Sequence, residues 1–461
     1  MIYGVRPLVL LFALTVLTAG GSILYLSYVA HTAGTPIAAE FPAPETSVAI
    51  NNATLTENLV AGHGFSLATT APYTPDSWRT PGYPLFVYPF LALTGSFYPV
   101  LIAQILTLFL TVILIFKMAE RLLGTKWATA LCALYLFLPD TMLSASALLN
   151  ENLFLLFFMA AFYLLFFSDV KNIYFKFALT GALFAIATYI RPASLYLLFI
   201  FIPAYFLFYL RWNELTKKNL VAGLILIIAY TGVLLPWCIR NEVQTGVFAF
   251  ASTGPYVLFR QNATQFYEAY HHVSNLDARF ALEDMAGIPH GVVPLEAQYS
   301  AVLEKVALQV IFEHPFRYAL FHLTTFIPFF TSSGANDYWN FVQPMLPNFN
   351  PQPEPSLIQA LNPFSLPLLL TVLGNHGWTL VENSFWGLVL ILVLIGLWRS
   401  KDVRLMRLFF AVAVYFALVT GPISHARYRI PVEPLLLIGA FSAALYLYEK
   451  HGKNLHLRTR S

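Results

Sequence analysis

The sequence predicts an all-α polytopic membrane protein with about 12 transmembrane helices, and three observations lead to that fold class. Of the 461 residues, 58% are hydrophobic and only 11% are charged, a composition that soluble domains do not show. Apolar stretches of about 20 residues, long enough to cross a bilayer core, recur along the whole chain. Lysine and arginine gather in alternate short loops between these stretches, as expected of loops that face the cytoplasm.

The first apolar segment, residues 1–30, resembles a signal peptide because a single Arg6 precedes its apolar run. The run is longer than the apolar region of a signal peptide, and no strong small-residue cleavage site follows it. We therefore expect this segment to remain as the first transmembrane helix, with a cytoplasmic N-terminus.

Further crossings follow from the remaining apolar runs. The segment 315–373 gives the weakest signal, because no lysine or arginine lies between Arg317 and Arg399. Its two crossings could instead form one re-entrant or interfacial unit. The expected crossings are 7–30, 99–117, 127–140, 150–168, 176–190, 194–210, 219–237, 315–331, 356–373, 384–398, 406–421 and 431–448.

The chain is therefore expected to place its soluble mass outside the membrane, in two loop regions. The inside loops are short and contain neither a GxxxxGK[ST] nor a GxGxxG motif before a helix, so nucleotide-driven chemistry and nucleic-acid binding are not expected. Cys132 and Cys238 lie in apolar runs and do not indicate a disulfide framework. The predicted organisation is a first helix at 1–30, an external loop with juxtamembrane helices at 31–98, helices 2–7 at 99–239, an external region at 240–314, helices 8–12 at 315–448 and a cytoplasmic tail at 449–461.

Within the first external loop, the stretch SWRTPGYPLF at 77–86 places an arginine and two prolines directly before an apolar run. The run that follows is short, rich in aromatic residues and broken by Pro84 and Pro89. Such a segment suits a helix that lies at the membrane interface better than one that crosses the membrane.

Five arginines at the expected external boundary run against the usual inside bias of basic residues. Each of them alone could anchor the chain by reaching toward the lipid headgroups. A guanidinium group also binds phosphate through two parallel hydrogen bonds, so together they suit an anionic lipid headgroup. The five are Arg79, Arg191, Arg240, Arg427 and Arg429, and Tyr83 and Tyr428 in the same motifs complete the expected substrate-binding set with Glu151.

Two carboxylates stand out among the few acidic residues. Glu151 opens an apolar stretch, where an ionisable side chain is a functional candidate, or else pairs with one of the boundary arginines. Glu45 precedes a helix-compatible stretch at 45–64. It is either a catalytic carboxylate or simply favourable for the helix dipole.

Several stretches, taken in order, resemble GT-C glycosyltransferases of the bacterial dolichyl-phosphate-mannose-protein mannosyltransferase and aminoarabinose transferase type. These proteins typically show N-L-x-x-G-x-G-F and then R-x-P-x-Y-P in the first external loop. The matching stretches here are NLVAGHGFS at 58–66, RTPGYPLF at 79–86, ALLNENLFLL at 147–156, ATYIRPASL at 187–195, LPWCIRN at 235–241 and ARYRIPVEPLL at 426–436.

This resemblance implies a GT-C-like helical bundle and a polyprenyl-phosphate-linked sugar donor. It also implies transfer to a glycan, lipid or protein acceptor on the external face of a bacterial inner membrane. It assigns the donor phosphate to Arg79, with Arg427 and Arg429 as helpers, implies no cofactor and leaves a divalent metal open. A transporter or flippase of a lipid-linked saccharide, or a non-catalytic relative that binds polyprenyl phosphate, remain as alternatives.

The chain departs from the family pattern at the catalytic acid. The family usually has an aspartate shortly before N-L-x-x-G, and an ungapped match places Ser47 and Val48 there. Glu45 supplies the carboxylate if this chain has about one extra helical turn, and would then act as the general base toward an acceptor hydroxyl.

Overall fold

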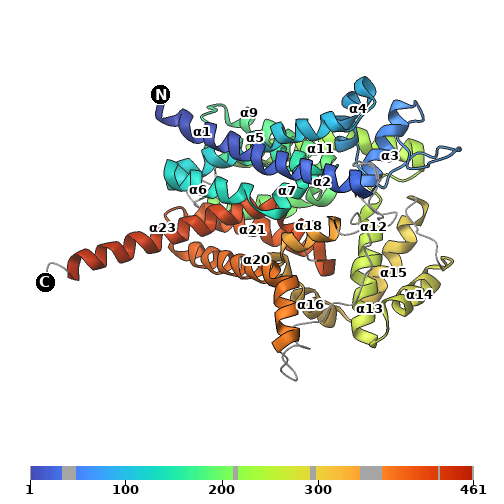
Figure 1. Cartoon of the computed structure of the whole chain (residues 1–461). Coiled ribbons are helices and arrows are strands. Elements are labelled where there is room, and N and C mark those ends of the chain that lie inside the picture. The colour runs from blue at the N-terminus through green and yellow to red at the C-terminus, as the bar shows by residue number, and fades with distance from the viewer. Residues whose placement is uncertain are drawn as a thin grey trace.

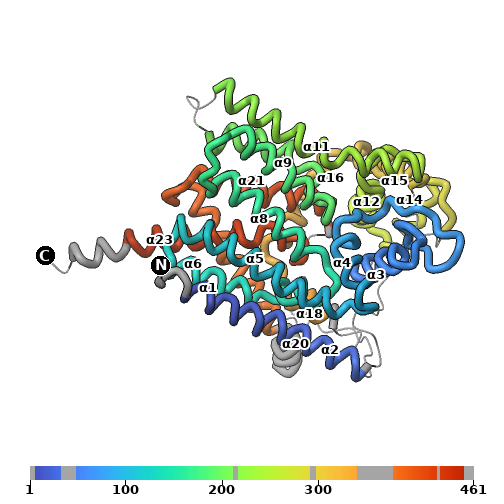
Figure 2. The backbone as a smooth tube through the Cα atoms, turned by 90° about the horizontal axis from the view of Figure 1, so that it is seen from above, coloured from blue at the N-terminus to red at the C-terminus, as the bar shows by residue number. Residues whose placement is uncertain are grey.

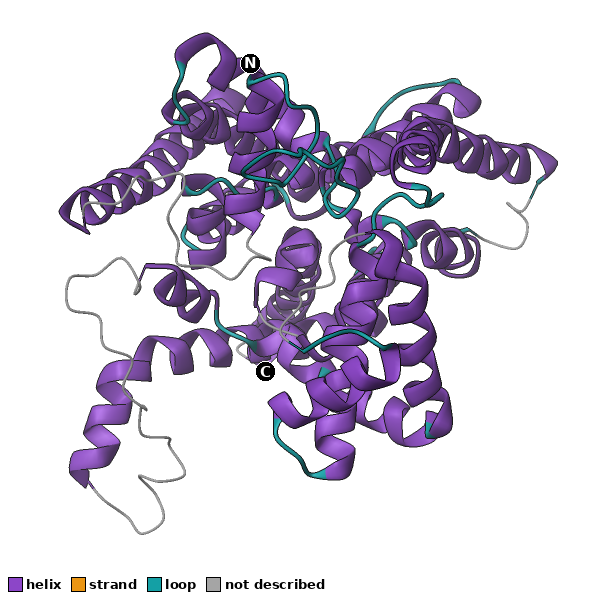
Figure 3. Cartoon of the chain, turned by 90° about the vertical axis from the view of Figure 1, so that its right-hand side faces the viewer, coloured by secondary structure: helices purple, strands orange, loops and turns teal. Residues whose placement is uncertain are grey.

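The computed structural model describes residues 2–33, 48–210, 216–290, 297–342, 366–423 and 426–458. Over these ranges the chain forms helices joined by loops and contains no strand (Figure 3). The all-α class expected from the sequence is therefore confirmed.

Seven helices are long and apolar enough to cross a membrane, which confirms a polytopic membrane protein. An eighth crossing is formed if α6 (Thr125–Leu136) and α7 (Pro139–Ser146), bent by 63°, act as one span. The break falls before Pro139, since proline disfavours a helical residue in front of it. The seven are Arg6–Thr32, Tyr98–Leu123, Ile173–Ile190, Lys217–Thr245, Gly377–Arg399, Val403–Thr420 and Ala426–Lys450.

The helices of the bundle have the following bounds. They are α1 (Ile2–Thr15), α2 (Gly21–Ala33), α5 (Tyr98–Leu123), α6, α7, α8 (Glu151–Phe167), α9 (Ile173–Ile190), α10 (Leu197–Ala204), α11 (Lys217–Thr245), α17 (Phe326–Thr331), α18 (Gly334–Val342), α20 (Leu366–Arg399), α21 (Val403–Thr420), α22 (Ala426–Arg429) and α23 (Glu433–Arg458).

Of the two crossings expected within 315–373, the one at 315–331 is not formed, which leaves the alternative of a re-entrant or interfacial unit, and the one at 356–373 lies partly outside the described residues. Residues 315–331 form two short helices, α16 (Pro315–Thr324) and α17, of 10 and 6 residues, and neither can span a bilayer core. The described part of 356–373 belongs to α20, which also contains 384–398. Hydropathy alone cannot separate a continuous helix from one that breaks, so the sequence predicted a crossing at 315–331 where the structure has two short helices.

The remaining helices gather at one end of the bundle, opposite the two chain termini (Figures 1 and 2). Their own small core contains Trp78, Tyr256, Phe259, Phe266 and Leu282 and is separate from the main core of the bundle. These helices are α3 (Val48–Val60), α12 (Thr253–Val257), α13 (Thr264–His271), α14 (Asn275–Ala286), α15 (Ser300–Glu313) and α16.

Helix α4 (Gly82–Thr94) joins the two parts, and it is too short to cross the membrane. Its 13 residues extend about 20 Å, against a hydrocarbon core of about 30 Å. The helix ends at Gly95, which adopts the left-handed conformation with φ 67°. Helix α4 therefore does not cross the membrane by itself, and its location at the membrane interface stays a prediction.

Candidate functional site

The loop that carries Arg79 is held against the end of α9. A Cβ atom added at Gly82 would lie 2.6 Å from the backbone oxygen of Tyr189, so only glycine allows this close approach. The Oδ2 atom of Asp76 accepts a hydrogen bond from the Arg79 N–H at 3.0 Å. On the other side of the loop, Trp78 packs edge-on against Tyr256, with ring centroids 4.7 Å apart. The loop is therefore fixed between the bundle and the small core.

Glu151 lies at the centre of the site, at the first position of α8, with 1% of its surface exposed. Its Oε1 atom accepts a hydrogen bond from Nε of Arg427 at 2.6 Å and lies 3.4 Å from Nη1 of Arg191. The Arg191 guanidinium in turn lies over the ring of Tyr428, 5.7 Å from its centroid. The pairing of Glu151 with boundary arginines, one of the two interpretations of the sequence, is the one observed.

Arg79 lies close enough to this pair for their charges to act on its own pKa. Burial, together with a smaller effect of the positive charge of Arg427, lowers the pKa of Arg79 to about 10. The negative charges of Asp76 and Glu151 oppose that shift. Three guanidinium groups, those of Arg79, Arg191 and Arg427, therefore lie within electrostatic reach of one buried carboxylate.

Asp76 is a carboxylate to which the sequence analysis gave no role. Burial raises its pKa to about 6, although backbone N–H groups of Arg79 and Trp78 and the charges of Arg79 and Arg240 all act to lower it. The only signal in the sequence is its position three residues before Arg79.

Arg240 lies beside this loop and supports it. Its Nη1 atom donates to the backbone oxygen of Asp76 at 2.5 Å, and its guanidinium lies over the Trp237 ring at 4.7 Å. Arg240 is therefore linked to the site through its hydrogen bond to Asp76. Among the described residues, no hydrogen bond or ion pair joins Arg240 to Glu151.

Tyr83 is fully buried behind the site. Its hydroxyl donates to Oε1 of Gln104 at 2.6 Å, and Nε2 of Gln104 donates to the backbone oxygens of Ala145 and Ala147. Those residues immediately precede the segment that carries Glu151. This placement favours a supporting role for Tyr83 over the substrate contact expected from the sequence.

Arg429 is also fully buried. It donates from Nη1 to the backbone oxygen of Ser332 at 2.8 Å and from Nε to Oε1 of Glu433 at 3.1 Å. These partners favour a structural role over the phosphate contact expected for it. Of the other expected site residues, Tyr428 lies at the site and Glu45 lies outside the described residues.

Asp337 of α18 is a second carboxylate that the sequence analysis missed. Its Oδ2 atom accepts a hydrogen bond from the backbone N–H of Arg427 at 3.0 Å. It lies within 315–373, where none of the family-like stretches falls, so no sequence motif pointed to it.

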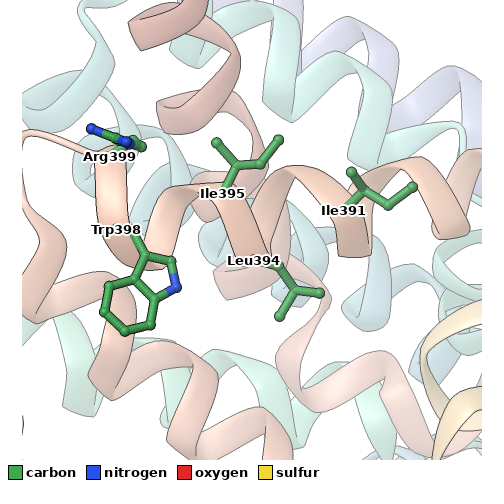
Figure 4. A pocket seen from close by; sticks show the side chains of 5 residues that line it. All are labelled: Ile391, Leu394, Ile395, Trp398 and Arg399. Carbon is green, nitrogen blue, oxygen red and sulfur yellow. The ribbon is translucent and has the colours of Figure 1, made fainter.

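Two further features of the described residues bear on ligands. Those residues contain no group of three or more His, Cys, Asp or Glu side chains arranged to bind a metal ion. A surface depression of about 570 Å³ lies along α20, lined by Ile391, Leu394, Ile395, Trp398 and Arg399 (Figure 4). None of its lining residues is among the partners of Glu151, so it is not treated as part of this site.

Residues 78–237 match the family model of dolichyl-phosphate-mannose-protein mannosyltransferases. A search of curated proteins finds no match to the chain. The matched region begins at the loop that carries Arg79 and includes Glu151 and Arg191, so it contains three of the charged groups that meet in the structure. Over residues 78–237 the chain is thus similar to the dolichyl-phosphate-mannose-protein mannosyltransferase family, and its apolar helices make it a polytopic membrane protein.

Proposed function

We propose that the protein transfers a sugar from a polyprenyl-phosphate-linked donor to an acceptor on the external face of a bacterial inner membrane. The observation that carries the proposal is the convergence of Arg79, Arg191 and Arg427 around Glu151. The loop that carries Arg79 packs against the small core through the contact of Trp78 with Tyr256. A headgroup phosphate bound there would leave the polyprenyl chain beside the bundle and the sugar next to the small core.

The proposed reaction breaks the bond between the sugar C1 and the phosphate oxygen. The polyprenyl phosphate leaves with the bonding electrons, and its developing negative charge is stabilised by the guanidinium groups, of which Arg79 is the principal one. Glu151 holds Arg191 and Arg427 in place through its Oε1 atom. The guanidinium groups are held in place before the polyprenyl-phosphate sugar binds. They therefore need little rearrangement during the reaction.

The acceptor hydroxyl attacks C1 from the opposite side and loses its proton to a carboxylate base. We propose Glu45 for this role. If an enzyme with Glu45→Gln retains its activity, Asp76 is the next candidate, because it lies beside Arg79 and its pKa is raised to about 6. A base with a pKa near the working pH is effective because it is largely ionised yet still basic.

The proposal is tested by incubating the purified protein with polyprenyl-phosphate sugars and an acceptor mixture and measuring released polyprenyl phosphate. We expect release by the wild type and a loss of about 10²-fold or more in kcat/KM for Arg79→Ala, the size typical of losing one transition-state donor. Arg317→Ala is the matched control, since Arg317 is exposed and lies over Tyr270, away from Glu151. No release from any donor would contradict the proposal, and binding without release would instead favour a non-catalytic relative.

A further inference from the structure

The main chain at Arg427 is held by residues outside all of the boundary motifs. Its side chain pairs with Glu151, while its backbone N–H donates to Asp337 on α18. The position of α18 therefore sets the position of the Arg427 backbone, and with it the direction from which the guanidinium approaches Glu151.

The first turn of α18 is bound in turn by Glu382, a residue of α20 with 6% of its surface exposed. The Glu382 carboxylate accepts hydrogen bonds from Ser333 Oγ at 2.7 Å, from Gly334 N at 3.1 Å and from Ala335 N at 2.8 Å. Backbone N–H groups at a helix start lack partners within their own helix and carry partial positive charge, so a carboxylate there is favourable. Glu382 thus caps α18 from a separate helix.

The same region of α20 also holds the other side of the Arg427 segment. Trp386 lies one turn after Glu382, is 1% exposed, and its ring lies 3.8 Å from the Arg429 guanidinium. Arg429 donates to the backbone oxygen of Ser332, which is directly before the residues that Glu382 caps. Gly334 fits here because a Cβ atom at that position would overlap the carboxylate of Asp140. The corner before α18 and the Arg427 segment are therefore locked to each other and to α20.

We propose that Glu382 is a positioning residue for the Arg427–Glu151 pair. It fixes the start of α18, α18 presents Asp337, and Asp337 anchors the backbone of Arg427. The inference rests on the proposed function only for the identity of the ligand that the pair binds. Helix α20 carries none of the family motifs, yet according to this proposal it controls the geometry of the Arg427–Glu151 pair.

The test uses the full chain in lipid nanodiscs and measures how fast phenylglyoxal, an arginine-specific reagent, modifies Arg427, by peptide mass spectrometry. Glu382→Gln keeps the side-chain shape but removes the charge that caps α18. We expect Arg427 to react about fivefold faster, the change in open population expected when one or two hydrogen bonds that hold a segment are lost. Arg79, held by its own loop, serves as the internal reference and should react as in the wild type. Ser384→Ala, an exposed position on the same helix, is the matched control.

A second readout is the kinetics of the donor. Glu382→Gln should raise the KM for a polyprenyl-phosphate sugar about tenfold, because a small displacement of Arg427 weakens its contact with the bound phosphate. The kcat should stay within about twofold of the wild type. If Glu382→Gln does not fold, Ser333→Ala removes one of the three contacts and should shift the Arg427 reactivity in the same direction. A folded variant of either kind with unchanged Arg427 reactivity overturns the proposal. The labelling needs no donor, so a failure of the proposed function would leave its result standing.

Discussion

At the residue scale, the charge pairs of this protein differ sharply in burial. The carboxylate of Glu151 is 1% exposed and serves two guanidinium groups, whereas the Arg121–Asp169 pair is 47% and 92% exposed. Removing one partner of a buried pair leaves the other charge without solvent or counter-ion. Exposed pairs contribute little because water and salt screen them.

We therefore predict that Glu151→Ala lowers the free energy of unfolding by about 3 kcal/mol or more, because Arg191 and Arg427 both lose their carboxylate. Thermal denaturation of the purified protein measures this. Asp169→Asn is the control and should leave the midpoint unchanged. A Glu151→Ala protein that melts with the wild type would show that the site tolerates unpaired guanidinium groups.

The raised pKa of Asp76, about 6, predicts a pH-dependent affinity for the donor. Its value in the folded protein lies above the ordinary aspartate value of 3.8, so the carboxyl keeps its proton up to a higher pH and ionises as pH rises through about 6. The new negative charge then competes with phosphate for Arg79. The affinity for a phosphodiester donor, whose own charge stays constant, should fall about twofold, the effect of a unit charge about 8 Å away in a water-like medium.

Equilibrium binding of a polyprenyl phosphodiester on either side of this pKa measures the effect. Asp76→Asn should abolish the pH dependence, since the amide oxygen can still accept the Arg79 N–H that closes the turn. The same pH dependence in the Asp76→Asn protein would assign it to another group.

At the scale of elements, the contact between the Arg79 loop and α9 depends on the absence of a side chain at residue 82. Gly82→Ala should lower the free energy of unfolding by about 1–3 kcal/mol, the usual cost of overpacking, and weaken donor binding as the loop moves from α9. Denaturation midpoints and donor affinity give the two measurements.

The matched change is Gly232→Ala within α11, where an added Cβ meets nothing within 4 Å. Alanine is the better helix former, so this change should stabilise the protein by up to about 1 kcal/mol. Equal effects of the two substitutions would contradict a specific packing role for Gly82.

At the scale of the whole molecule, the turn between α5 and α6, which is flanked by basic residues, lies toward the end of the bundle that holds the two termini, opposite α3 and α12–α15 (Figures 1 and 2). The positive-inside rule places the basic end in the cytoplasm. In a variant with both native cysteines changed to alanine, Asn275→Cys on α14 should react with a membrane-impermeant maleimide in intact cells. Asp169→Cys, at the basic end, should react only after permeabilisation. The reverse pattern would invert the orientation and move the site to the cytoplasmic face.

Much of this architecture could be predicted from the sequence. Long apolar runs reveal helices directly, because a buried or lipid-facing helix must be apolar over the thickness it crosses. The short length of α4 followed from its prolines, and the boundary arginines followed from where apolar runs end. The break at 315–331 and the single helix α20 did not follow, since mean hydropathy carries no information on where a helix bends or continues.

The sequence by itself determined that Arg427 and Arg429 lie in one motif at the end of an apolar helix. Only the tertiary structure decided that they act differently. Side chains two positions apart point to nearly opposite faces of a helical turn. Arg427 therefore meets Glu151 at the site, while Arg429 is buried against Trp386, Glu433 and the backbone of Ser332. Most of those partners come from segments far from these arginines in the sequence. A local sequence pattern therefore cannot predict which of the two arginines will be buried against them.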